Sequence, residues 1–125
     1  MFRAVWNGAV LAESYRTVKV DGSHYFPPES LHREHFTGSP ATSTCTWKGQ
    51  ARYYHVRVDG KVNPGAAWYY PQPSPAASKI TGHVAFWHGV RVERVPGPGE
   101  QAGNGTGRGL AGRILGRLHR AGPQR

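Results

Sequence analysis

The stretch Ala51–Val58, with the sequence ARYYHVRV, decides the fold class. Successive side chains of a β-strand point to opposite faces, and this stretch alternates over its whole length. One face carries Tyr54, Val56 and Val58. The opposite face carries Tyr53, His55 and Arg57. Asp59-Gly60 follows as a turn dipeptide. The stretch therefore predicts a strand that ends in a tight turn.

The composition agrees with a mainly β protein. The chain has 125 residues, of which 38% are hydrophobic, 17 are Gly and 10 are Pro. This turn-rich composition can still supply one core, and its length fits one domain. Further strands are expected at 14–20, 66–70, 82–87 and 90–95, the last two as a closing hairpin around His88-Gly89. Short helical turns are expected at 27–31 and 74–80, where Ser74 is placed as an N-cap before Pro75.

The composition changes at Pro96. Residues 96–125 hold nine of the 17 glycines, five basic residues and one acid. This predicts a domain over residues 1–95 followed by a flexible Gly/Arg-rich tail over 96–125. Leu110, Ile114 and Leu118 leave open a short basic amphipathic helix that touches an anion or a membrane surface.

The net charge of +9 means that acidic partners must be considered. A single cysteine excludes an internal disulfide framework and a Cys-rich zinc site. No apolar run reaches the length of a membrane span, and no secretory signal opens the chain, so a cytoplasmic location is expected. His32 and His35 have ligand-like spacing, but no third ligand is evident, so neither a metal nor another cofactor is expected.

The densest chemistry lies in the segment 45–54, CTWKGQARYY. Cys45 lies three residues before Lys48, so it could be a thiolate of lowered pKa, or Lys48 could act as a reactive amine. The alternatives are a packed thiol and a solvated lysine. Gly49 would allow a ligand to approach the backbone closely.

Four Trp, six Tyr and four Phe exceed what a small β core needs. Trp68-Tyr69-Tyr70 and Phe86-Trp87 must place rings on both faces of their strands. One set would pack the core, and the other would line a ligand cleft, extend the packing or form an oligomer interface such as a homodimer. Basic residues between aromatic ones also suit single-stranded nucleic acid, although no nucleic-acid-binding motif is present, so nucleic acid is not the expected partner.

Five motifs resemble one family in their order and spacing. They are AVWNG at 4–8, DGSHYFP at 21–27, CTWKG at 45–49, AAWYYP at 66–71 and GHVAF at 82–86. The chain is similar over about residues 2–95 to the bacterial domain of unknown function 427, which is sometimes labelled a nucleotidyltransferase domain. The resemblance implies a β-tent-like fold, two antiparallel sheets meeting at an angle around a cavity, with one or two short helices.

The resemblance also implies functional positions. The family's characteristic positions fall on Tyr25, Cys45, Lys48, Gly49, Tyr53, Trp68, Tyr70 and Pro71. Thr46 stands where the family usually has Pro, and Asp21 stands where Glu is common. Proteins of similar fold hold zinc on paired C-x-x-C motifs, which are absent here, so no zinc is carried over. The nucleotidyltransferase label gains no support, because no Asp-x-Asp that could hold Mg²⁺ occurs.

Together these patterns predict a small-molecule binding domain of unknown ligand with an aromatic-lined cleft between two sheets. Trp68 and Tyr70 would supply ring walls, and Tyr25 and Tyr53 would supply polar tips. Lys48 would make an electrostatic contact beside the Cys45 thiol. The alternatives are an enzyme with Cys45 or Lys48 as the reactive group, and then a single-stranded nucleic-acid binder. On this interpretation Trp68→Ala should abolish ligand binding and leave the fold largely intact.

Overall fold

The computed structural model describes residues 1–96, which form nine β-strands and three 3-10 helices. The strands are β1 (Phe2–Trp6), β2 (Ala9–Ser14), β3 (Val18–Val20), β4 (Ser23–Tyr25), β5 (Phe36–Cys45), β6 (Gly49–Val58), β7 (Lys61–Tyr69), β8 (Val84–Phe86) and β9 (Arg91–Arg94). The helices are η1 (Pro28–Ser30), η2 (Arg33–His35) and η3 (Pro75–Ile80). The mainly β class predicted from the sequence is confirmed. No helix within residues 1–96 is long and apolar enough to cross a membrane. The tail expected at 96–125 lies almost wholly outside the described residues.

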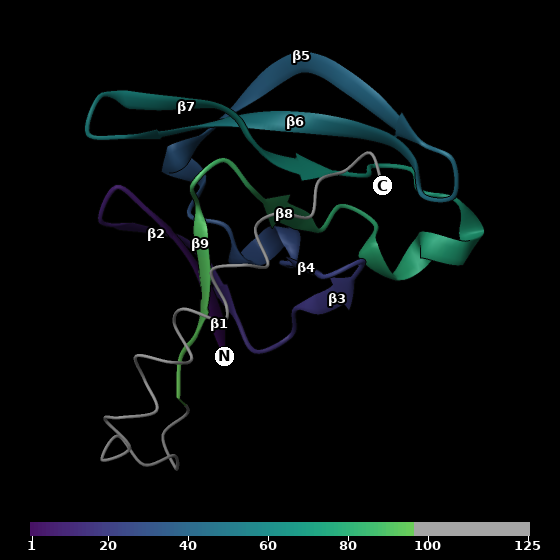
Figure 1. Ribbon diagram of the computed structural model, residues 1–125, viewed down its shortest axis with the longest axis horizontal. Helices are drawn as coiled ribbons and strands as arrows, with labels where there is room; N and C mark the ends of the chain where they lie inside the picture. The colour runs from purple at the N-terminus through teal and green to yellow at the C-terminus, as the bar shows by residue number, and fades with distance from the viewer. Residues whose placement is uncertain (97–125) are drawn as a thin grey trace.

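The strands form three antiparallel sheets, ordered β2-β1-β9, β3-β4 and β5-β6-β7-β8. In Figure 1, β5, β6 and β7 cross the upper part of the molecule, while β9 runs nearly upright below them. The small sheet is joined to the large one, because Phe26, which follows β4, exchanges two backbone hydrogen bonds of 2.7 and 2.8 Å with Val84 of β8. The arrangement is thus a large sheet extended by β4 and β3, with a three-stranded sheet beside it.

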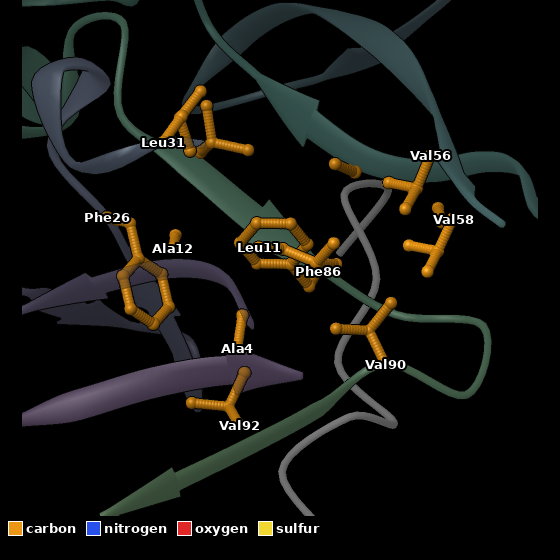
Figure 2. Packing of buried hydrophobic residues seen from close by; sticks show 13 residues of the cluster. Ala4, Leu11, Ala12, Phe26, Leu31, Val56, Val58, Phe86, Val90 and Val92 are labelled. Carbon is orange, nitrogen blue, oxygen red and sulfur yellow. The ribbon is translucent and has the colours of Figure 1, made fainter. Parts of the chain in front are cut away.

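The large sheet has a hydrophobic core on each face. Its register aligns Tyr54, Ala67 and Phe86 in one row, and these residues belong to or pack against the first core. This core includes Leu11 and Val92 of the three-stranded sheet, and Figure 2 labels both among the side chains of the cluster. The neighbouring row, Tyr53, Trp68 and Ala85, belongs to a second core. Because successive strand residues alternate, the second core lies on the opposite face of the sheet.

The second core is closed by short elements. Val18 and Val20 of β3 pack against it, and Ala77 and Ile80 of η3 are members of it. The alternation expected in Ala51–Val58 is therefore present in β6, with apolar side chains buried on both faces. The turn expected at Asp59-Gly60 is also confirmed, with φ values of 50° and 78°.

The closing hairpin expected over 82–95 is wrong. The turn at His88-Gly89 is present, but β8 pairs with β7 and β9 pairs with β1. The physical reason is packing, since β9 places Val92 opposite Ala4 in the first core. The chain leaves one sheet and enters another at this turn.

The strand expected over 14–20 is interrupted. β2 ends at Ser14 and β3 begins at Val18. The Ser14 Oγ accepts a 2.8 Å hydrogen bond from the Arg16 backbone N–H, a local turn that competes with strand pairing. The helical turns at 27–31 and 74–80 exist as 3-10 helices. Ser74 does not cap η3 with its side chain, because its Oγ donates to the Trp47 carbonyl at 2.5 Å.

Candidate functional site

The structure brings the six predicted site residues together. Five belong to the second core: Tyr25 on β4, Cys45 at the end of β5, Tyr53 on β6, Trp68 on β7 and Tyr70 directly after β7. Lys48, in the turn between β5 and β6, lies beside them, with its Nζ 5.7 Å from the centre of the Tyr70 ring. Residues distant in sequence therefore converge on one end of the large sheet.

The turn between β5 and β6 places Lys48. Cys45 pairs with Gly49 at the last position of the β5–β6 ladder, so the residues between them form the connection. Gly49 has φ of +113°, a conformation that L side chains rarely adopt. A Cβ there would lie 3.5 Å from the Gln72 carbonyl, so the following loop packs directly on the turn. Ser74 N–H donates to the Lys48 carbonyl at 3.0 Å and fixes this contact.

Lys48 is fully buried and carries a charge partner. Its Nζ lies 2.8 Å from Asp21 Oδ2, and the Asp21 side chain is 37% exposed while that of Lys48 is 0% exposed. The Nζ also lies 5.5 Å from the centre of the Trp47 ring, which is itself exposed. A cation over an aromatic face is stabilised by the ring quadrupole. The ammonium of this pair is thus shielded from solvent, whereas the carboxylate is partly exposed to it.

Asp21 is the site residue that sequence reasoning missed. The dipeptide Asp21-Gly22 predicts a turn, and the structure confirms it with φ values of 51° and 80°. The same turn aims the carboxylate at Lys48 from 27 residues away. The available signal was the position itself, since the family resemblance places another acid, Glu, there.

Tyr25 and Trp68 form a buried polar contact within the rings. Trp68 Nε1 donates to the Tyr25 hydroxyl at 3.1 Å, and the rings meet edge to face with centroids 6.1 Å apart. Burial raises the pKa of Tyr25, while the hydrogen bond from Trp68 and the charge and hydrogen bond of Lys48 oppose the rise. The hydroxyl of Tyr25 therefore stays protonated at neutral pH.

Tyr70 is fully buried among the other site residues. Burial raises the pKa of Tyr70, and Tyr25, Cys45, Tyr53 and Asp21 raise it further. A phenol in such surroundings is a neutral hydrogen-bonding group and not a base. At the edge of the group, the Tyr53 hydroxyl and Ser43 Oγ share a hydrogen bond of 2.7 Å.

Burial limits the direct contact that the six residues can make with a ligand. Each is at most 7% exposed, so their side chains pack against one another. Trp68, with 0% exposure, is a core residue, and Trp68→Ala is now expected to cost about 3–5 kcal/mol of folding free energy. The expectation that this substitution would leave the fold largely intact does not fit its burial. Solvent reaches the group at Asp21 and at Trp47, which is 40% exposed.

The two histidines with ligand-like spacing face different partners. His32 Nε2 lies 3.9 Å from a Glu13 carboxylate oxygen, whereas His35 Nδ1 contacts the Arg57 carbonyl at 2.9 Å. Within residues 1–96, no three His, Cys, Asp or Glu side chains are grouped to hold a metal ion.

Comparison with known proteins identifies a family. The model of a family described as a domain of unknown function (DUF427), with the short name NTP_transf_9, matches residues 1–96. No curated protein matches the chain. The matched region coincides with the residues that the structure describes.

Proposed function

The chain belongs to the DUF427 family, and we propose that it binds a small molecule where the buried Lys48–Asp21 pair reaches the surface beside Trp47. One observation carries the proposal: a lysine with no exposed side-chain surface holds its carboxylate partner, Asp21, in a position that solvent can reach. The six residues expected from the sequence form the floor of this site, and Asp21 and Trp47 form its rim.

Stability gives little reason for such a pair. The desolvation of two charges offsets much of their attraction, and an apolar pair of similar volume is often as stable or more stable. Groups with strongly perturbed pKa values gather at functional sites more often than elsewhere. Here a buried ammonium lies beside two tyrosines whose pKa values are raised, chiefly by burial. This combination favours a binding role over a purely structural one.

The rim defines the ligand chemistry. The Asp21 side chain is 37% exposed and carries a carboxylate, a hydrogen-bond acceptor, and the exposed Trp47 ring offers a flat apolar surface. The ligand that fits is a neutral ring-bearing compound with an N–H or O–H donor. Lys48 holds the Asp21 carboxylate in place through their 2.8 Å contact, and so contributes electrostatically without leaving the core.

An enzyme that uses Cys45 or Lys48 covalently is the second candidate, and the geometry favours it less. The Lys48 ammonium donates to Asp21 and has no lone pair for attack, and Cys45 is 2% exposed. Nucleotidyl transfer uses carboxylates around Mg²⁺, and within residues 1–96 no three His, Cys, Asp or Glu side chains are grouped. The family's short name therefore remains without chemical support in this part of the chain.

The test is a thermal-shift screen of the full chain against neutral ring-bearing compounds, nucleoside triphosphates with Mg²⁺, and a single-stranded oligonucleotide. A neutral ligand at about 100 times its dissociation constant adds about 2.7 kcal/mol, which raises Tm by several degrees. Trp47→Ala should abolish this shift. Tyr15→Ala, which also removes an exposed ring, should keep it and serves as the control.

Three outcomes would overturn the proposal. Neutral hits that survive Trp47→Ala would place the ligand elsewhere. Hits confined to triphosphates with Mg²⁺ would support the nucleotidyltransferase label instead. Hits confined to the oligonucleotide, with affinity that falls steeply with salt, would indicate a nucleic-acid binder.

A further inference from the structure

A surface pocket lies on the face of the large sheet that is opposite the Lys48–Asp21 site. It has a volume of about 260 Å³ and is lined by Gln50, Arg52, Pro71 and Gln72. Gln50 and Arg52 alternate along β6 with the buried residues Ala51 and Tyr53, so they point away from the second core. The pocket is therefore separate from the proposed site, although both lie at the same end of the sheet.

Both walls of the pocket are fixed by backbone contacts. One wall is β6, which is paired with β5 through Thr42↔Arg52 and with β7 through Arg52↔Tyr69. The other wall is the loop that follows Tyr70. Ser74 anchors this loop to the β5–β6 turn through hydrogen bonds to the carbonyls of Trp47 and Lys48. The backbone of the lining residues is thus held in place before any ligand binds.

The charge in this pocket is a guanidinium without a carboxylate partner in the part of the chain that is described. Among the ion pairs found within residues 1–96, none involves Arg52. The positive charge of Arg52 acts on the nearby Tyr69. Burial and Tyr54 raise the pKa of Tyr69, and Arg52 opposes the rise. Arg52 is therefore a cation available to a ligand.

We propose that this pocket binds a small molecule through a carboxylate group of that molecule. A guanidinium presents a planar fork of N–H donors that matches a carboxylate with two parallel hydrogen bonds. Gln50 and Gln72 bring amide N–H donors to the same space, and Pro71 adds an apolar wall for the carbon skeleton. The volume is below the range typical of drug-sized ligands, so the pocket fits a small carboxylate.

The experiment is an NMR titration of the full, ¹⁵N-labelled chain with benzoate. We expect saturable shifts at the backbone amides of Gln50, Arg52 and Gln72. Benzyl alcohol, which has the ring without the carboxylate, should give no saturable shift there. Inorganic phosphate should bind at least about tenfold more weakly than benzoate, because it has no carbon skeleton to pack against Pro71.

Variants of β6 test the role of the guanidinium. Arg52→Gln should weaken benzoate binding at least about tenfold, the equivalent of one charge-assisted hydrogen bond. Arg52→Lys should recover part of the loss, since it restores the charge without the fork. Arg57→Gln is the matched control, an exposed arginine near the other end of β6, and should bind benzoate as the wild type does.

The proposal is overturned if benzoate shifts other amides, if Arg52→Gln and Arg57→Gln bind alike, or if phosphate binds as tightly as benzoate. Its failure is distinguishable from that of the proposed function. Trp47→Ala should leave benzoate binding unchanged, because the Trp47 side chain does not line this pocket.

Discussion

The two residues of the Lys48–Asp21 ion pair differ in burial, so substituting one should cost more folding free energy than substituting the other. Asp21→Asn keeps the shape of the side chain but removes the negative charge from beside a fully buried ammonium. Lys48→Met removes the ammonium and places an apolar chain of similar length against the aromatic rings. The carboxylate that remains is 37% exposed and can be hydrated. We therefore expect Asp21→Asn to be much the more damaging substitution.

The expected magnitudes follow from burial. Removing the partner of a buried charge costs about 3–5 kcal/mol, and Asp21→Asn should fall in this range because the Lys48 ammonium then loses its carboxylate and keeps the neutral Tyr25 hydroxyl as a partner. Replacing the buried cation with an apolar side chain is often neutral or stabilising, so Lys48→Met should stay within about 1 kcal/mol of the wild type. With an m-value of about 1.5 kcal/mol per molar urea, the midpoint should fall by about 2–3 M for Asp21→Asn and by less than about 1 M for Lys48→Met.

The assay is equilibrium urea unfolding followed by tryptophan fluorescence, with the double variant included. Asp21→Asn/Lys48→Met should be nearly as stable as Lys48→Met alone, because the charge that Asp21 balances is gone. This rescue remains measurable even where Asp21→Asn alone does not fold. Equal losses in the two single variants, or a double variant as unstable as the sum of both, would refute the reasoning.

Three further predictions concern the turn, the buried hydrogen bond and pH. Gly49→Ala should lose about 1–3 kcal/mol in urea unfolding, because φ is +113° there, whereas Gly38→Ala, in open space on β5, should lose much less; equal losses would contradict the strain argument. Tyr25→Phe should cost about 1–3 kcal/mol, since it leaves the buried Trp68 Nε1 without its acceptor, and a loss below about 0.5 kcal/mol would show that this bond contributes little. Burial lowers the pKa of His24, so the unfolded state binds more protons and stability should fall as pH drops below about 6.5; His24→Asn should flatten the pH dependence of the urea midpoint, and an unchanged slope would count against it.

The features of the fold that could be predicted from the sequence are those with a local cause. Alternation in Ala51–Val58 and the turn chemistry of Asp59-Gly60 are local, and both are found. β5 was missed because its ten residues, Phe36–Cys45, are mostly exposed and carry no apolar alternation; they form an edge strand that is defined by pairing with β6. The hairpin over 82–95 failed for the related reason that partner choice is set by packing. Pairing β9 with β1 buries Val92 in the first core, and this burial outweighs pairing with β8, the preceding strand in the sequence.

The candidate site, like the fold, has features that could be predicted from the sequence and features that could not. The residue types at Tyr25, Cys45, Lys48, Trp68 and Tyr70 could be singled out from composition and family motifs, and the fold gathers them at one end of the sheet. Their depth could not be predicted, because strand alternation gives the face of a side chain and not what covers that face. Short elements cover it here, the small β3–β4 sheet and η3, and neither is distinguished by a strong periodic pattern.

The partner of Lys48 shows what this depth means for function. A lysine in a turn between strands is ordinarily solvated, and a buried one requires a compensating charge from elsewhere in the chain. The Asp21-Gly22 turn supplies that charge from 27 residues away in the chain, while leaving the carboxylate partly in water. One turn therefore both completes the core and presents a polarised acceptor at the surface. A ligand that binds this acceptor is coupled through a single ion pair to the rings beneath it, so binding at the rim and stability of the second core should rise and fall together.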